Sequence, residues 1–117
     1  MPFIKVQSSV TIPEKAKVDS MLTSLSAKLA QHLGKPESYV MTAFESDVPM
    51  TFGGTFDPVC LVEIKSIGTM KPEQTAAMSA DFCQVIESEL GVSSARIYLE
   101  FVDVQRHLWG WNKSTFG

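Results

Sequence analysis

Two long segments of the chain place apolar residues at the spacing of a helix. The first runs from about Pro13 to residue 33, with apolar residues recurring every three or four positions. Its stripe consists of Val18, Leu22, Leu25, Leu29 and Leu33. Gly34 follows at once and suits the left-handed conformation that ends many helices. The pattern predicts an amphipathic helix over residues 13–33.

The second segment covers residues 72–90 and has the same design. Pro72 suits the first helical turn, where its missing N–H group costs nothing, and Gly91 supplies the stop. Its predicted inward residues are Phe82, Cys83, Ile86 and Leu90. Cys83 is therefore predicted to be a core thiol.

Four shorter runs rich in apolar and β-branched residues predict strands, at residues 3–8, 39–45, 59–66 and 96–102. Residues 47–58 contain Pro and Gly and are predicted to form a long loop or hairpin. Residues 34–44 and 91–101 both run from a glycine through polar residues into a strand that ends in Phe. A β-α-β unit is therefore expected twice, over about 2–46 and 59–103, in one domain spanning 1–117.

This order of elements predicts an α+β fold, with two helices covering one face of a four-stranded mixed sheet. The strands at 39–44 and 96–101 carry apolar or aromatic side chains at both alternating sets of positions. Such strands suit a sheet that is covered on both faces. Because no third layer is available in the sequence, a second copy of the chain is the expected cover.

Composition narrows the choice of partners. The chain has 117 residues and a net charge of −3, so it lacks the basic field that nucleic acids or anionic membranes require. No run approaches the length of a spanning helix, and no signal peptide is apparent, which predicts a soluble, unexported protein. Cys60 and Cys83 are expected to be reduced. No metal-ligand spacing appears, and no cofactor is expected.

The usual catalytic motifs are missing, but one unusual group remains. Pro2 follows the initiator Met1, so removal of Met1 would leave a secondary amine at the start of a strand. An α-amine titrates at about pH 7.7–8.0, and burial or a nearby cation lowers that value. Such an amine could act as a base near neutral pH. A proline at this position is by itself weak support.

Six motifs in order give the chain a specific resemblance. They are Met1-Pro2, Gly34-Lys35-Pro36 followed by Tyr39-Val40, the 50–58 segment MTFGGTFDP, Ser66-Ile67-Gly68, Arg96-Ile97-Tyr98 and the 110–116 segment GWNKSTF. Together they resemble the macrophage migration inhibitory factor family of the tautomerase superfamily. The resemblance spans essentially the whole chain. It implies a homotrimer whose sheets pack around a central axis, with a small pocket at each subunit interface.

The resemblance also implies roles for particular residues. Pro2 would be the base that moves a proton between an α-keto acid and its enol, with phenylpyruvate-type or dopachrome-like compounds as substrates. Lys35 would pair with the substrate carboxylate and help to keep the amine neutral, and the Ile67 N–H would bind substrate oxygen. Tyr98 would come from the neighbouring subunit. The apolar pocket would be lined by Phe3, Trp109, Trp111 and Phe116.

Two departures from the family pattern affect these expectations. Glu100 stands where animal members usually carry Asn, on the same strand face as Tyr98. Its carboxylate would repel an anionic substrate or, if buried, could supply an acid. The family's Cys-x-x-Cys is absent around Cys60, which predicts no thiol-disulfide oxidoreductase activity.

Two other functions remain open at this stage. One is a cytokine-like or host-modulating protein that binds a receptor and has weak or vestigial tautomerase activity. The other is a structural or regulatory trimer without turnover. Retention of Met1 would favour both, because it caps the Pro2 nitrogen. The expected location is cytoplasmic, with secretion without a signal peptide as the alternative.

Overall fold

The computed structural model describes residues 1–11 and 13–117. The main chain forms β1 (Phe3–Ser8), α1 (Lys15–Leu33), β2 (Met41–Glu45), β3 (Cys60–Ile67), α2 (Pro72–Leu90) and β4 (Ile97–Val104). A short hairpin of β5 (Gly110–Trp111) and β6 (Ser114–Thr115) follows. Three single-turn 3₁₀ helices, η1 (Glu37–Tyr39), η2 (Ser94–Arg96) and η3 (Arg106–Leu108), lie before β2, before β4 and before β5.

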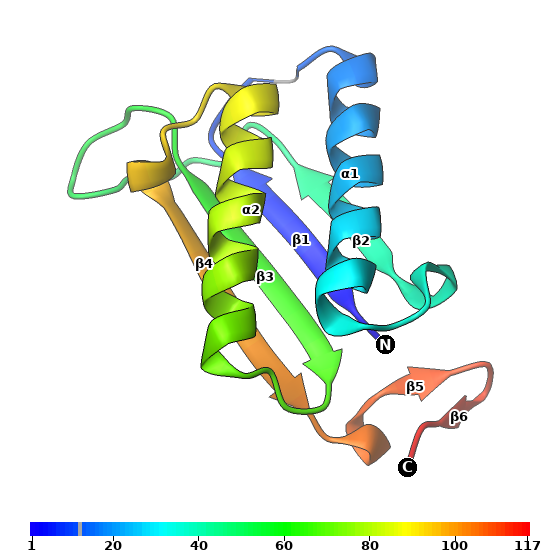
Figure 1. Cartoon of the computed structure of the whole chain (residues 1–117). Coiled ribbons are helices and arrows are strands. Elements are labelled where there is room, and N and C mark those ends of the chain that lie inside the picture. The colour runs from blue at the N-terminus through cyan, green and yellow to red at the C-terminus, as the bar shows by residue number, and fades with distance from the viewer. Residues whose placement is uncertain (12) are drawn as a thin grey trace.

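The first four strands form one mixed sheet in the order β2-β1-β3-β4. β1 pairs in parallel with β2, β3 pairs in parallel with β4, and the two halves meet through the antiparallel β1–β3 pair. Both helices lie side by side on one face of this sheet (Figure 1). The predicted α+β architecture is therefore confirmed.

The core lies between the helices and the sheet. Alternate residues of the two inner strands are fully buried, including Ile4 and Val6 of β1 and Val62 and Ile64 of β3. They belong to one apolar cluster that also contains Met21, Leu25, Leu29, Met78, Phe82 and Ile86 of the helices. This alternation places the remaining residues of the same strands on the opposite, open face of the sheet.

The helices end where the sequence predicts. Gly34 and Gly91 both have left-handed backbone angles, with φ of 63° and 70°. The first helix begins at Lys15, two residues after the predicted Pro13, and its buried face includes Met21, which the predicted stripe omitted. Cys83 is half-buried against the core cluster, so the prediction of a core thiol holds only in part.

The bounds of three strands differ from the prediction. Tyr39 and Arg96 end 3₁₀ turns, so β2 starts at Met41 and β4 starts at Ile97. β3 is shifted by one residue from the predicted 59–66, and β4 continues to Val104 instead of ending at residue 102. The β5–β6 hairpin has no counterpart in the prediction. Its turn residues Asn112 and Lys113 both have positive φ, as a two-residue hairpin turn requires.

The open face of the sheet is more polar than the edge strands suggested. In register, Ala43, Lys5, Glu63 and Glu100 form a row across its middle. Lys5 and Glu45 form an ion pair with 2.7 Å between Nζ and Oε1. Exposed apolar side chains remain near the ends of this face, at Met41 and Tyr98, which are 65% and 66% exposed. An apolar surface from another copy would therefore pack mainly against the ends of the open face, and less against its polar centre.

Candidate active site

The start of β1 brings the N-terminus to the middle of the sheet. Pro2 is fully buried, and its carbonyl accepts a hydrogen bond from the Met41 N–H at 3.0 Å. Phe3 then pairs with Met41 on one side and with Lys65 on the other. Because β1 is paired between β2 and β3, the Pro2 nitrogen lies at the end of a central strand, with a neighbouring strand on each side.

Lys35 reaches the same place from the end of α1. The left-handed Gly34 turns the chain back toward the sheet, and the Lys35 N–H bonds to the Ala30 carbonyl at 3.0 Å. The Lys35 Nζ donates to Ser66 Oγ at 2.7 Å and to the carbonyl of Ile67. Ser66 is itself buried in β3. These contacts hold the ammonium group at the carboxyl end of the strand.

The ammonium group and the chain terminus influence each other. Burial is the main cause that lowers the pKa of the Met1 amine, and the nearby Lys35 charge and hydrogen bond lower it further. Burial also lowers the pKa of Lys35, while its hydrogen bond to the amine and the charge of Asp103 oppose that change. Burial and Lys35 therefore both favour the neutral form of an amine at this end of the chain.

Two adjoining cavities surround the N-terminus. One of about 500 Å³ is lined by Met1, Lys35, Ile67, Gly68, Asp103, Val104, Gln105, Arg106 and Phe116. The other, of about 670 Å³, is lined by Met1, Pro2, Phe3, Ser38, Tyr39, Val40, Met41, Lys65, Trp109, Gly110, Trp111 and Phe116. Met1 and Phe116 belong to both linings. The two volumes lie in the range of small-molecule sites.

Aromatic side chains form a wall of the larger cavity. The Tyr39 ring meets the edge of Trp111 at 5.7 Å, and Trp111 stacks on Phe116 at 5.8 Å with an interplanar angle of 13°. The β5–β6 hairpin and η3 carry this wall, and the Phe116 N–H bonds to the Trp109 carbonyl at 3.2 Å. The site thus combines cationic side chains, Lys35 and Arg106 at the smaller cavity and Lys65 at the larger one, with an apolar, aromatic surface.

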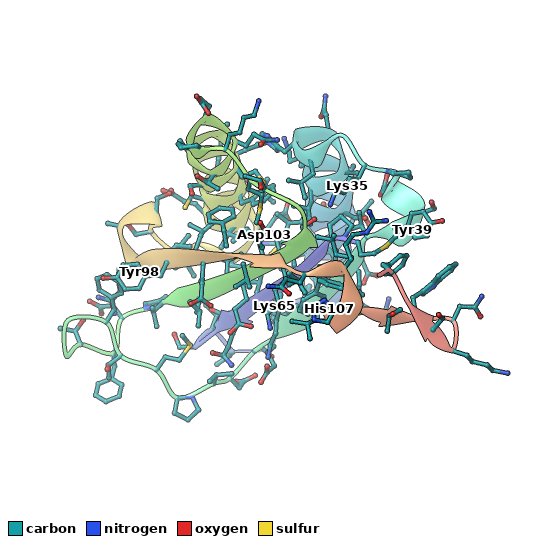
Figure 2. The ribbon with its side chains drawn as sticks, turned by 90° about the horizontal axis from the view of Figure 1, so that it is seen from below. Lys35, Tyr39, Lys65, Tyr98, Asp103 and His107 are labelled. Carbon is teal, nitrogen blue, oxygen red and sulfur yellow. The ribbon has the colours of Figure 1, made fainter. Side chains whose placement is uncertain are left out.

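The structure brings together seven of the predicted site residues and separates two. Those around the cavities are Pro2, Phe3, Lys35, Ile67, Trp109, Trp111 and Phe116. Tyr98 and Glu100 lie toward the other end of β4, and Tyr98 and Lys35 occupy opposite sides of the view in Figure 2. Tyr98 is about 20 Å along the strand from Val104, at about 3.3 Å per residue. Neither Tyr98 nor Glu100 lines the cavities of its own chain.

Several polar residues at the site were missed by sequence reasoning, among them Lys65, which lines the larger cavity. Ser66 anchors Lys35, Asp103 accepts a hydrogen bond from the Gly68 N–H at 3.0 Å, and Arg106 donates from Nε to the Phe116 carbonyl at 3.2 Å. Asp103 and Arg106 line the smaller cavity. Asp103 and Arg106 lie shortly after the predicted strand at residues 96–102. Charged residues at the end of a strand were the one feature of the sequence that could have indicated them.

Other kinds of site receive no support from the part of the chain that the structure describes. Across residues 1–11 and 13–117, no three His, Cys, Asp or Glu side chains are grouped so that they could hold a metal ion. Within the same ranges, neither helix is sufficiently long and apolar to cross a membrane. The N-terminal cavities therefore remain the candidate site.

The fold and the site together define a β-α-β-β-α-β protein with a proline at position 2 and a lysine at an aromatic pocket. The sequence model described as "Macrophage migration inhibitory factor (MIF)" matches residues 1–117, and the chain belongs to this family, within the tautomerase superfamily. A Brugia malayi homologue is 33% identical over 117 residues, covering all of both chains. The Rattus norvegicus factor is 34% identical over 116 residues, covering 99% of each.

Solved structures give the same assignment. A macrophage migration inhibitory factor homologue from Prochlorococcus marinus has a TM-score of 0.92 and 50% identity, covering 98% of this chain and 99% of that one. The Toxoplasma gondii macrophage migration inhibitory factor has a TM-score of 0.91 and 30% identity, covering 97% and 99%. The resemblance read from the six motifs is confirmed.

Proposed function

We propose that this protein is a keto–enol tautomerase that acts on phenylpyruvate-type α-keto acids, with dopachrome-like compounds as further candidate substrates. The observation that carries the proposal is the placement of Lys35 beside the N-terminus. A fixed cation, a terminus that favours the neutral amine and an aromatic cavity occur together at the start of β1. This combination suits an aromatic substrate that carries a carboxylate.

The base would be the Pro2 nitrogen after Met1 has been removed. In the enol-to-keto direction, the neutral amine accepts the proton of the enol hydroxyl, and the carbonyl forms as the C=C electrons move to the neighbouring carbon. The resulting ammonium group delivers a proton to that carbon. The amine then returns to its neutral state, so the step is balanced without a cofactor.

Binding would divide between charge and apolar contact. Lys35 would hold the substrate carboxylate, and the Ile67 N–H would bind substrate oxygen. The aromatic ring would lie against Trp109, Trp111 and Phe116, which already form an apolar surface. The same charge at Lys35 would lower the pKa of the Pro2 amine, as it does, after burial, for the Met1 amine.

The pocket would be completed by a neighbouring subunit of a homotrimer. Tyr98 is exposed and lies at the end of β4 away from its own cavities, so in this proposal it serves the pocket of another copy. Such a head-to-tail contact closes into a ring when the rotation between copies is one third of a turn. Exposed Met41 at one end and Tyr98 at the other are consistent with this arrangement.

The test compares processed wild type with Pro2→Gly in a phenylpyruvate tautomerisation assay. Intact mass first establishes that Met1 is absent from both proteins. We expect the variant to lose about 10²–10⁴-fold in kcat/KM, the usual contribution of a positioned base. A Pro13→Gly variant, altered shortly before α1 and outside the linings of both cavities, controls for loss of a proline as such.

A processed wild type that does not exceed the uncatalysed rate would refute the proposal. In that case a binding role, cytokine-like or structural, would be the better explanation of the conserved fold. Equal activity of wild type and Pro2→Gly would instead remove Pro2 from the mechanism.

A further inference from the structure

The Arg96 side chain makes five hydrogen bonds, all of them to one loop. A guanidinium group has five N–H donors. Nε donates to the Pro58 carbonyl at 2.9 Å, Nη1 to the Phe52 carbonyl and Thr55 Oγ1 at 3.3 and 2.8 Å, and Nη2 to the Thr55 and Asp57 carbonyls at 3.2 and 2.8 Å. All five acceptors are neutral and lie within residues 52–58, which we term the 52–58 loop. Arg96 is therefore a template for this loop.

The loop has its own tight turn. Phe52 and Thr55 exchange backbone hydrogen bonds at 3.0 and 3.1 Å, and Gly53 and Gly54 between them have φ of 59° and 76°. Two positive φ angles define the hairpin turn for which glycine is well suited. The loop projects beyond the sheet next to the start of β4 (Figure 1). Such an exposed loop has little packing of its own and depends on Arg96 for its position.

The loop in turn holds an aromatic pair. The Arg96 guanidinium lies over the Phe52 ring at 5.4 Å from its centroid, and the Phe52 ring contacts the Tyr98 ring at 4.9 Å with a tilt of 56°. Tyr98 lies on edge strand β4 and is 66% exposed. Phe52 is thus the ring against which the Tyr98 side chain rests in the free subunit.

We infer that Arg96 is a positioning residue for the tautomerase site, acting through Phe52 to fix Tyr98 before the neighbouring subunit meets it. The inference rests on the proposed function, in which Tyr98 completes the pocket of another copy. Fixing the ring in advance removes the entropy cost of ordering it when substrate binds. Each pocket would then be completed by a Tyr98 ring that the neighbouring subunit already holds in position.

Lysine is not an adequate substitute for arginine at this position. Its ammonium group has three donors on one atom, whereas the acceptors of the 52–58 loop surround a planar fork. Arg96→Lys keeps the charge but loses most of the template. We expect KM for phenylpyruvate to rise about tenfold, with kcat changed less than about twofold, because Tyr98 contributes binding that is uniform along the reaction.

Two further variants separate positioning from simple structural support. Phe52→Leu keeps the Phe52 carbonyl and all five Arg96 bonds but removes the ring that contacts Tyr98, so it should raise KM to a similar degree. Because Arg96 acts through Phe52, adding Arg96→Lys to Phe52→Leu should change KM little further. Thr55→Val, which removes one of the five acceptors, should have an intermediate effect. Trimer mass and melting temperature are measured for every variant.

The outcomes are distinct. A rise in KM for Arg96→Lys and Phe52→Leu that is not additive supports the inference. The inference is overturned if both variants have the wild-type KM, or if their melting temperature falls without a change in KM. If Arg96→Lys does not fold, the test rests on Phe52→Leu alone. A wild-type KM in that variant would then contradict the inference. Inactive processed wild type refutes the proposed function, and the inference falls with it.

Discussion

At the scale of single residues, the central relation is between Lys35 and the terminal amine. Lys35 is held by Ser66 Oγ and the Ile67 carbonyl, so it cannot move away when the amine nearby takes a proton. Two ammonium groups at close range repel each other, and after burial the Lys35 charge is the next cause that lowers the pKa of the Met1 amine. In the proposed mechanism one lysine would therefore both attract the substrate and favour a neutral base.

This relation predicts the pH dependence of the proposed activity. Only the neutral amine accepts a proton, so kcat/KM should rise with pH through the pKa of the Pro2 amine. We expect burial and Lys35 to lower that pKa, as they lower the pKa of the Met1 amine in the chain that retains Met1. Lys35→Met removes the cation, so the acid limb of the profile should move to higher pH. We also expect kcat/KM to fall about 10- to 100-fold through loss of the carboxylate contact. The control is Lys17→Met, on the exposed side of α1. It should leave the acid limb of the pH profile and kcat/KM unchanged.

Glu100 allows a second test at this scale. It is exposed and stands in register with Glu63, so two carboxylates share one part of the open face. If Tyr98 enters a neighbour's pocket, Glu100 lies two residues away on the same face and opposes an anionic substrate. Glu100→Asn should lower KM for phenylpyruvate about two- to fivefold, and added salt should reduce the difference. Kinetics that match wild type for Glu100→Asn would show that the carboxylate does not reach the pocket.

At the scale of elements, the turn after α1 sets the position of Lys35. Gly34 has φ of 63°, and a Cβ there would meet no atom within 4 Å, so its requirement is conformational and not one of space. The helix ends there, and the next residue is directed toward the sheet. The same local rule ends α2 at Gly91. Both stops were predictable because a left-handed residue after a helix is a local property of the chain.

Gly34→Ala should therefore destabilise the fold by about 1–2 kcal/mol, the cost of the left-handed conformation for a residue with a Cβ. Chemical denaturation measures the free energy of unfolding. Gly110→Ala is the matched control, since Gly110 has no positive φ and its added Cβ would make an ordinary 3.4 Å contact with the Ser114 carbonyl. A similar loss in both variants would contradict the conformational explanation.

Where the element predictions were inaccurate, long-range contacts explain the difference. Residues 37–39 and 94–96 form 3₁₀ turns although Tyr39 and Arg96 suit strands. The β-propensity of a residue has meaning only where a partner strand is available. The β5–β6 hairpin was missed because its strands have two residues each, too few to give an alternating pattern. Asn112, which readily takes positive φ, was the available signal.

At the scale of the whole molecule, the two ends of the sheet have different functions in the proposal. One end holds the Pro2 and Lys35 site, and the other carries Tyr98, Phe52 and the 52–58 loop. A single subunit cannot bring these ends together, because β4 separates them by about 20 Å. Activity would then require assembly.

Mixing two impaired variants, assayed at phenylpyruvate concentrations well below the wild-type KM, tests this requirement. Pro2→Gly removes the base, and Tyr98→Ala removes the residue that a neighbour supplies. When the two proteins are unfolded together and refolded as mixed trimers, some pockets combine an intact Pro2 with an intact Tyr98. Random mixing at equal amounts should restore up to about a quarter of the wild-type activity. Refolding each variant alone is the control, and no gain on mixing would contradict a shared pocket.

Helix periodicity, turn chemistry and motif order are local properties of the chain, and from them the two helices, their glycine stops, the four strands and the family could be predicted. The sequence could also nominate Pro2, weakly from its position after Met1 and more specifically through resemblance, whereas Lys35 was nominated only through resemblance. The tertiary structure decided which side chains meet: that Ser66 anchors Lys35, that Arg106 and Asp103 join the cavity, and that Tyr98 points away from it. These contacts join residues far apart in the chain, and strand order and register fix them.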